Sequence, residues 1–329
     1  MHLIMKLTDK QIKEITKGAY SIEQENGVLV FYRMPKEITA KYQSVRGEMY
    51  IRTLASSGIR FDFLSDTKYL KIRYFLKKGS SQNKGAFDVW VNGRLYGSEG
   101  EDIIDGDSRE IEFCFEGGEK HITVYFPTLS QTFITSVELS DGATLTPFEN
   151  KPLALFFGDS ITQGYITELP SMNYVTRFSE MSGYDFYNYA VGGDIYNSIV
   201  TENVPDRKPE IIFVSYGTND WSGNLTSGAL KKNMRDFYSI LYTKYPSSKI
   251  VAILPIWRDV QDRPTREIGE FENLHKLMRT ILSEFPKVKI IDGLELVPHS
   301  PRLFADKYLH PNDTGFEFYA NALFEKMSK

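Results

Sequence analysis

The chain has 329 residues, of which 41% are hydrophobic, and its 39 basic and 43 acidic residues give a net charge of -4. This length predicts two domains of about 100–200 residues each. The nearly even charge excludes a strongly basic protein, so we expect no nucleic-acid partner. No apolar run reaches the roughly 18 residues of a membrane span, and the N-terminus lacks the apolar core of a signal peptide. We therefore expect no membrane partner and a cytoplasmic location, although secretion after loss of a leader stays open. The oligomeric state is unknown at this stage.

Residues 1–147 are rich in short segments of β-branched and aromatic side chains, which are typical of strands. These segments are 28–32, 69–76, 86–91, 109–115, 121–126 and 134–139. Asn92 and Gly93 separate two apolar stretches and predict a two-residue hairpin turn. Beyond residues 9–17 we expect no helix in this half. The pattern predicts an all-β sandwich of jelly-roll type as an accessory domain.

Residues 148–329 begin within a linker at 144–152 that contains two prolines, and after it the sequence pattern changes. Continuous apolar runs, typical of strands buried on both faces, occur at 153–157, 210–215, 249–254 and 288–291. Between them, apolar residues recur at helical steps of three and four, for example Leu230, Met234, Phe237 and Leu241. This half therefore predicts an α/β domain with a mostly parallel sheet flanked by helices.

Four polar segments fall where a parallel sheet of this kind forms its site, at the C-terminal ends of the strands. Ser160 follows the first apolar run in Gly158-Asp159-Ser160, Gly193 follows a strand at 184–189, and Asn219 follows the third strand. His310 comes just before the last helix. Residues 158–164 lack the Lys-Ser/Thr ending of a phosphate loop, so that function is excluded. Taken alone, the first segment is also consistent with a simple capped turn.

Taken in order, these segments resemble the GDSL or SGNH hydrolase family over roughly residues 150–329. The resemblance implies that Ser160 is the nucleophile and His310 its general base. It also implies that the Ser160 N–H, the Gly193 N–H and the Asn219 side chain stabilise the oxyanion. A serine hydroxyl needs such a base, and the tetrahedral oxyanion needs fixed donors. The reaction needs no cofactor, and no group of residues has metal-ligand spacing, so we expect no metal.

Asp306 departs from the family pattern, because the family has its acid three residues before the histidine and Asp306 lies four before His310. On a helical turn both spacings place the two side chains on one face, so Asp306 is the candidate orienting acid. The alternative is a Ser-His dyad whose imidazole is held by a backbone carbonyl.

Three further residues are candidates for substrate binding. Trp221 and Trp257 lie just past strand ends, which predicts a place on the rim of the site, where an indole stacks on a sugar or simply packs. Asp159, beside the nucleophile, is the third, with backbone hydrogen bonding as its alternative task.

The predicted order of a β-sandwich before the hydrolase domain resembles carbohydrate esterase family two, which removes acetyl groups from sugars. The resemblance implies a serine esterase that acts on short-chain acyl esters, O-acetyl esters above all, of small molecules or oligosaccharides, through an acyl-enzyme on Ser160. Two alternatives stay open. One is a lipase or thioesterase for longer acyl chains, and the other is a non-catalytic carbohydrate-binding protein.

Overall fold

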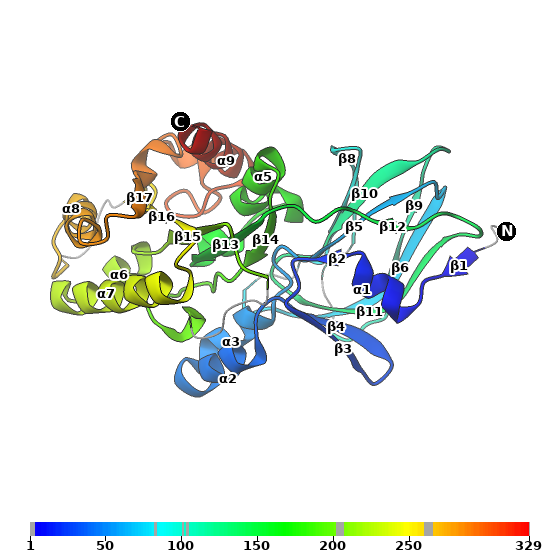
Figure 1. The fold of residues 1–329 in the computed structure, drawn as a ribbon, viewed down its shortest axis with the longest axis horizontal. Coiled ribbons are helices and arrows are strands. Elements are labelled where there is room, and N and C mark those ends of the chain that lie inside the picture. Colours follow the sequence, from blue (N-terminus) through cyan, green and yellow to red (C-terminus); the bar gives the residue numbers. More distant parts are fainter. Residues whose placement is uncertain are drawn as a thin grey trace. The chain divides into compact units, whose positions relative to one another are not determined.

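The chain forms two compact units in a computed structural model that describes residues 4–81, 84–100, 102, 105–201, 207–259 and 266–328 (Figure 1). The first unit comprises Met1–Lys36, Leu54–Lys151 and Leu169–Ser171. The second comprises Glu37–Thr53, Pro152–Glu168 and Met172–Lys329. The division into 1–147 and 148–329 stays a prediction. The sequence did not suggest that Glu37–Thr53 belongs to the second unit or that Leu169–Ser171 belongs to the first.

The first unit contains two antiparallel sheets, which confirms the predicted β-sandwich. One sheet has the order β3 (Ser21–Glu25), β4 (Val28–Tyr32), β11 (Gln131–Ser140), β6 (Tyr69–Lys77) and β9 (Arg109–Cys114), with β1 (Ile4–Lys6) also paired to β11. The other has the order β12 (Thr146–Pro147), β5 (Arg60–Ser65), β10 (Lys120–Tyr125), β7 (Phe87–Val91) and β8 (Arg94–Glu99), with β2 (Thr16–Lys17) beside β5. The helix α1 (Asp9–Glu14) lies between β1 and β2 in the chain.

Aromatic rings fill the core between these two sheets. Phe126 contacts Phe31, Phe61 and Phe87 edge to face, with ring centroids 5.2, 4.8 and 5.5 Å apart, and all four are buried. Such edge-to-face pairs add to the stability that burial alone gives. The hairpin between β7 and β8 is confirmed, because Asn92 and Gly93 have φ angles of 50° and 75°.

The second unit is built on a parallel sheet, as predicted. Its strand order is β14 (Asp185–Asn188), β13 (Leu153–Gly158), β15 (Ile211–Ser215), β16 (Lys249–Ile253) and β17 (Val288–Ile291). Its helices after β13 are α4 (Ser160–Gln163), α5 (Tyr174–Ser182), α6 (Thr218–Ser222), α7 (Ser227–Lys244), α8 (Phe271–Leu282) and α9 (Asp313–Ser328), with short 3-10 turns at Pro170–Met172, Ile199–Thr201, Gly293–Glu295 and Pro301–Leu303.

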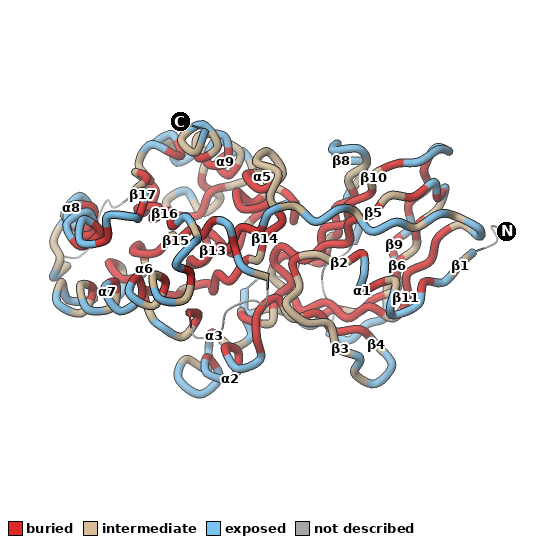
Figure 2. The backbone as a smooth tube through the Cα atoms, in the orientation of Figure 1, coloured by how far each residue is buried: buried red, intermediate tan, exposed pale blue. Residues whose placement is uncertain are grey.

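Both faces of the sheet are covered by helices. Successive side chains of a strand point to opposite faces, and Phe156 and Phe157 of β13 show this directly. Phe156 packs against Phe178 of α5, whereas Phe157 packs against Phe237 of α7. The central strands are accordingly buried along their length (Figure 2). None of the helices in the described ranges has the length and apolar character needed to cross a bilayer.

The expectation that the first half has no further helix is wrong. Two helices, α2 (Lys36–Val45) and α3 (Gly47–Leu54), follow β4 in the chain, and residues 37–53 belong to the second unit. The buried apolar residues of α2, Ile38 and Tyr42, are only one helical turn apart. So short a repeat does not stand out from the surrounding polar residues.

The strand order places three loops at one point of the sheet edge. The chain passes from β13 to β14 on one side and then to β15 on the other side of β13. Ligands bind to sheets of this kind at such a switch point, beyond the C-terminal ends of the strands. Ser160, Gly193 and Asn219 lie in the segments that directly follow β13, β14 and β15, so the topology brings these three residues into one region.

Replacing Phe126 by Ala tests the aromatic core of the first unit. We expect the free energy of unfolding to fall by about 3–5 kcal/mol, because the substitution leaves a cavity lined by three rings. Urea unfolding followed by circular dichroism measures this loss. Leu95→Ala is the control, because Leu95 lies on β8 in the same unit and is exposed. Similar losses in the two variants would contradict the assignment of this core.

Candidate active site

Ser160, His310 and Asp306 form a continuous chain of hydrogen bonds. The Ser160 Oγ lies 2.8 Å from the His310 Nε2, and the His310 Nδ1 lies 2.7 Å from the Asp306 Oδ2. Ser160 is half-buried, whereas His310 is buried except for 9% of its surface. This arrangement of hydroxyl, imidazole and carboxylate is able to remove a proton from the serine oxygen and to orient the base that accepts it.

The end of β13 determines where Ser160 lies. Asp159 caps the short helix α4, with its Oδ1 accepting a hydrogen bond from the Ile161 N–H at 3.0 Å. A Cβ atom on Gly158 would lie 2.2 Å from the Thr162 Oγ1, so only glycine lets α4 pack this closely against the strand end. Ser160 is therefore fixed as the first residue of a helix that starts directly at the sheet edge.

A tight turn, and not the expected helical turn, brings Asp306 to His310. The Asp306 Oδ1 accepts hydrogen bonds from the backbone N–H groups of residues 308–310 at 3.1, 2.8 and 3.1 Å. The chain curls around the carboxylate, and Lys307 takes a φ of 70° to allow it. The predicted contact is present, but its predicted helical cause is wrong.

These hydrogen bonds keep Asp306 ionised. Partial burial alone would raise the pKa of this carboxyl group. The hydrogen bond with His310 and the three backbone N–H groups outweigh burial, so the pKa of Asp306 lies well below its ordinary value. A permanently charged carboxylate favours the imidazole tautomer with its proton on Nδ1, which leaves the Nε2 lone pair facing Ser160.

Gly193 lies in a loop that passes close to the serine, and Asn219 is hydrogen-bonded to that loop. A Cβ atom on the adjacent Gly192 would lie 3.7 Å from the Ser160 Cβ, so this loop passes close to the nucleophile. Within the described part of the chain, no hydrogen bond uses the N–H of Ser160 or of Gly193. The Asn219 Nδ2 donates one hydrogen bond to the Asp194 carbonyl at 3.0 Å, and an amide group has a second hydrogen to give.

Three buried aspartates lie in the segments that carry these residues. Burial is the main cause that raises the pKa of Asp159 to about 7, and the carboxylates of Asp220 and Asp194 act in the same direction, against the hydrogen bond from the Ile161 N–H. Burial likewise raises the pKa of Asp220 to about 7. Ser160, Gly193 and Asn219 are each partly exposed, whereas the neighbouring aspartates are buried. In each segment the aspartate therefore points into the interior, whereas its neighbour in the predicted site stays accessible.

The predicted substrate-binding residues are placed differently. Of the two alternatives for Trp221, packing fits the structure, because the side chain is only 3% exposed, its indole N–H donates to the Gly269 carbonyl and its ring packs against Phe271. Asp159 is buried too, and its carboxylate holds the backbone of α4, so as placed it does not face a substrate.

Trp257 lies next to the turn that carries His310. It is half-buried, its indole stacks on the His299 ring at 5.6 Å, and it meets Phe304 edge to face at 5.2 Å. Its role in substrate binding stays a prediction.

Sequence reasoning missed three residues around the nucleophile. The Tyr165 ring meets the His310 imidazole edge to face at 4.6 Å. Gln163 accepts a hydrogen bond from the Gly192 N–H at 2.7 Å, and Arg52 of α3 donates one to the Gly192 carbonyl at 2.5 Å. Tyr165 and Gln163 lie within a few residues of Ser160 and were open to detection there. Arg52 gives no such signal, because it lies more than a hundred residues upstream.

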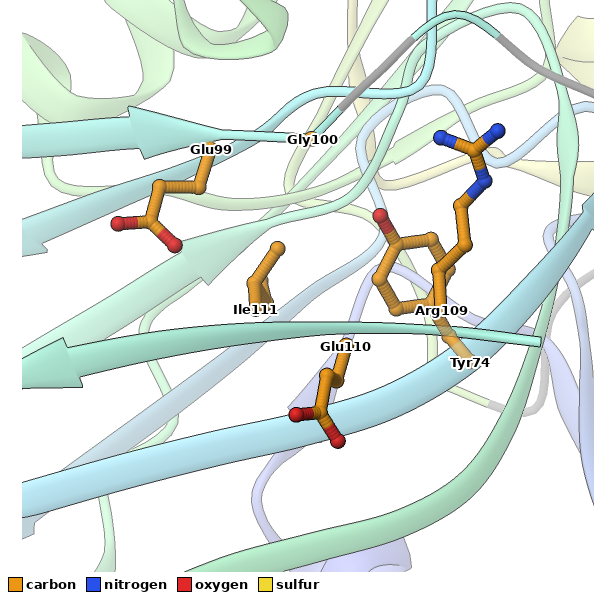
Figure 3. Close-up of a pocket in the computed structure, with 6 residues that line it drawn as sticks. All are labelled: Tyr74, Glu99, Gly100, Arg109, Glu110 and Ile111. Carbon is orange, nitrogen blue, oxygen red and sulfur yellow. The ribbon is translucent and has the colours of Figure 1, made fainter.

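A separate hollow of about 370 Å³ lies in the first unit. It is lined by Tyr74, Glu99, Gly100, Arg109, Glu110 and Ile111 (Figure 3). Glu110 is already neutralised from β6, where the Lys71 Nζ and the Arg73 Nε lie 2.8 and 3.1 Å from its oxygens. None of the predicted site residues lines this hollow.

Metal binding receives no support from the side chains that the structure describes. Among these residues, no group of three or more histidine, cysteine, aspartate or glutamate side chains is placed to hold a metal ion.

Comparison with protein families identifies the second unit. Residues 156–318 match the model of the GDSL-like lipase/acylhydrolase family, and this range contains Ser160, Gly193, Asn219, Asp306 and His310. The chain therefore carries a domain of this family and is an esterase or acylhydrolase, as the sequence motifs predicted. No curated protein matches the chain by sequence.

Solved structures share the fold along the whole chain. The chain is similar to a salicylyl-acyltransferase, SsfX3, from a tetracycline biosynthetic pathway, with a TM-score of 0.86, 22% identity, and 99% of this chain and 97% of that one covered. It is similar to a GDSL-like lipase from Bacteroides ovatus, with a TM-score of 0.78, 19% identity, and coverage of 99% and 97%. It is also similar to a family two carbohydrate esterase from Cellvibrio japonicus, with a TM-score of 0.69, 13% identity, and coverage of 99% and 98%. At these identities the likeness concerns the fold, which confirms a β-rich unit combined with an SGNH-type α/β unit.

The raised pKa of Asp220 predicts how its removal changes stability with pH. In the unfolded chain this carboxyl ionises near 3.8, whereas in the folded protein it ionises near 7. Because the folded state holds the proton longer, the contribution of Asp220 to stability falls as pH rises from about 4 to about 7. We therefore expect Asp220→Asn to gain free energy of unfolding relative to the wild type over this range.

Urea unfolding at several pH values measures this difference. The exposed Glu325→Gln variant, in the same unit, is the control for loss of a carboxylate. If the difference between Asp220→Asn and the wild type did not change with pH, Asp220 would not be a proton-holding group.

Proposed function

We propose that this protein is a serine esterase that hydrolyses short-chain acyl esters, O-acetyl esters of carbohydrates above all, through an acyl-enzyme on Ser160. The observation that carries the proposal is the hydrogen-bonded chain from the Ser160 Oγ through His310 to Asp306, with lengths of 2.8 and 2.7 Å. It supplies a nucleophile, a base and an orienting acid in one place. The reaction needs no cofactor.

The proposed reaction begins when the His310 Nε2 takes the proton of the Ser160 hydroxyl as its oxygen attacks the ester carbonyl carbon. The tetrahedral intermediate collapses, and the imidazolium returns the proton to the leaving alcohol. Water then attacks the acyl-enzyme by the same route in reverse and releases the acid. Asp306 keeps its charge throughout and stabilises the imidazolium that forms in each half of the reaction.

Negative charge develops on the carbonyl oxygen in both halves. The N–H groups of Ser160 and Gly193 and the second amide hydrogen of Asn219 are the proposed donors to this oxygen. Each donor of this kind contributes about 3–4 kcal/mol to transition-state stabilisation. Their partial exposure is consistent with this task, because an oxyanion donor has to face the bound substrate.

The proposed carbohydrate ester rests on the architecture. The fold of the family two carbohydrate esterase from Cellvibrio japonicus matches 99% of this chain. A second candidate function is acyl transfer to an alcohol other than water, which the likeness to the salicylyl-acyltransferase over 99% of the chain favours. Both functions share the acyl-enzyme and differ only in the acceptor.

Replacing Ser160 by Ala should abolish turnover with little change in stability. We expect acetate release from p-nitrophenyl acetate and from acetylated xylo-oligosaccharides to fall by at least about 10⁴-fold, because no other group supplies the nucleophile. Acetate is quantified directly, and thermal unfolding checks the fold. Residual turnover near that of the wild type would show that another residue is the nucleophile.

Three comparisons separate the alternatives. Faster turnover of octanoyl esters than of acetyl esters would favour a lipase or thioesterase. Formation of an acetylated acceptor alcohol in place of acetate would favour a transferase. Glycan binding with no ester turnover would favour a carbohydrate-binding protein without catalytic activity.

Replacing Asp306 by Asn distinguishes a triad from a dyad. The amide presents no charge to the imidazolium and favours the wrong tautomer, so we expect kcat to fall by about 10⁴-fold. Steady-state kinetics with p-nitrophenyl acetate measures the loss. A decrease of less than about tenfold would indicate that a backbone group orients His310 sufficiently without this carboxylate.

A further inference from the structure

Arg52 bonds to the peptide group that supplies a proposed oxyanion donor. Its Nη1 donates a hydrogen bond to the Gly192 carbonyl oxygen at 2.5 Å. That carbonyl and the Gly193 N–H belong to one planar trans peptide unit, in which they point in opposite directions. Fixing the oxygen therefore fixes the direction of the N–H.

A closed ring of hydrogen bonds links this peptide to the nucleophile's helix. The Gly192 N–H donates to the Gln163 Oε1 at 2.7 Å, and the Gln163 Nε2 donates to the Arg52 carbonyl at 2.9 Å. Gln163 ends α4, the helix that Ser160 begins. The serine and the loop with Gly193 are thus held in one network with α3.

The following residue of the loop, Asp194, is held by α2 and by the residue directly after it. The buried Asp194 carboxylate accepts hydrogen bonds from the Tyr42 hydroxyl and from the Arg46 Nη1, the latter at 2.7 Å. The Asp194 carbonyl accepts the bond from Asn219. Because Gly193 lies between two residues that are each held by the α2–α3 segment, its backbone has little freedom.

The Arg52 side chain also lies directly against Gly193. A Cβ atom on Gly193 would lie 2.6 Å from the Arg52 Nη1 and 3.4 Å from the Met49 Cε. Gly193 has a φ of 78°, which glycine adopts without strain. The loop backbone and the guanidinium group therefore fit together only because no side chain stands at this position.

We propose that Arg52 is a positioning residue of the oxyanion hole, which aims and polarises the Gly193 N–H through its bond to the Gly192 carbonyl. The guanidinium group is charged at all accessible pH values, and hydrogen bonds to charged donors are about twice as strong as neutral ones. Withdrawing electron density from the carbonyl makes the N–H of the same peptide a better donor. The inference rests on the proposed esterase function.

The test compares Arg52→Met, Arg52→Lys and a matched control. Arg52→Met removes every donor while keeping an unbranched chain, and Arg52→Lys keeps a charge and a donor. The control is Arg177→Met on α5 of the same unit, whose Nε donates to Glu317 of α9 at 3.0 Å, because it makes the same substitution at a hydrogen-bonded arginine outside the network around Gly193. Thermal unfolding of all three variants separates loss of fold from loss of positioning.

We expect Arg52→Met to lower kcat for p-nitrophenyl acetate by about 10²-fold, the loss typical of one oxyanion donor, with KM changed less than about threefold. Arg52→Lys should recover part of kcat, and Arg177→Met should keep it. If Arg52→Met does not fold, Arg52→Lys with an intermediate kcat still supports the proposal. A kcat near the wild-type value in the folded Met variant, or a change confined to KM, would overturn it.

A second readout does not depend on ester turnover. Fluorophosphonates phosphonylate an activated serine, and their phosphoryl oxygen uses the same donors as the ester oxyanion. We expect the rate of Ser160 labelling, followed by mass spectrometry, to fall in Arg52→Met in parallel with kcat. If the wild type is labelled but hydrolyses no ester, the esterase proposal fails, while the ratio of labelling rates still decides the role of Arg52. A wild type that is neither labelled nor active would overturn both.

Discussion

The imidazole of His310 is the group on which the rest of the site depends. Its two nitrogens join Ser160, at the start of the α/β unit, to Asp306, near the end of the chain. The two bonds are coupled, because a proton held on Nδ1 by a charged acid leaves Nε2 free to accept. In the turn at residues 306–310, three backbone N–H groups donate hydrogen bonds to the same carboxylate. These bonds fix the acid independently of its contact with the imidazole.

The loops around Ser160 combine buried charge with exposed donors. Asp159, Asp194 and Asp220 are buried and hold backbone or helix groups, whereas the adjacent Ser160, Gly193 and Asn219 are partly exposed. Burying carboxyl groups is unfavourable, as the raised pKa values of all three aspartates show. Under the proposed function the gain is rigidity, because donors that are already in place need no rearrangement when charge develops on a substrate.

Local patterns predicted the parts of this structure that local physics determines. Strands buried on both faces need continuous apolar runs, so β13 and β15 were visible, and with them the loops that carry Ser160 and Asn219. The burial of Trp221 and the contacts of Arg52 depend on segments far apart in the chain. Single-sequence patterns contain no information on such contacts. The turn around Asp306 is local, but it needs a positive φ at Lys307, which the residue type does not indicate. The cytoplasmic location and the role of Trp257 stay predictions.

The segment at residues 37–53 changes what the catalytic unit consists of. It precedes most strands of the β-sandwich in the chain, yet it belongs to the α/β unit and supplies Tyr42 and Arg52 to the loop after β14. A fragment that began at residue 148 would keep Ser160, His310 and Asp306, but the Asp194 carboxylate would lose the Tyr42 hydroxyl and the Arg46 guanidinium and would keep only Asn197 of these side-chain partners. Removing the charged partner of a carboxylate is destabilising, so the loop after β14 would be held less firmly. The motif-bearing half of the sequence is therefore physically incomplete without a piece of the other half.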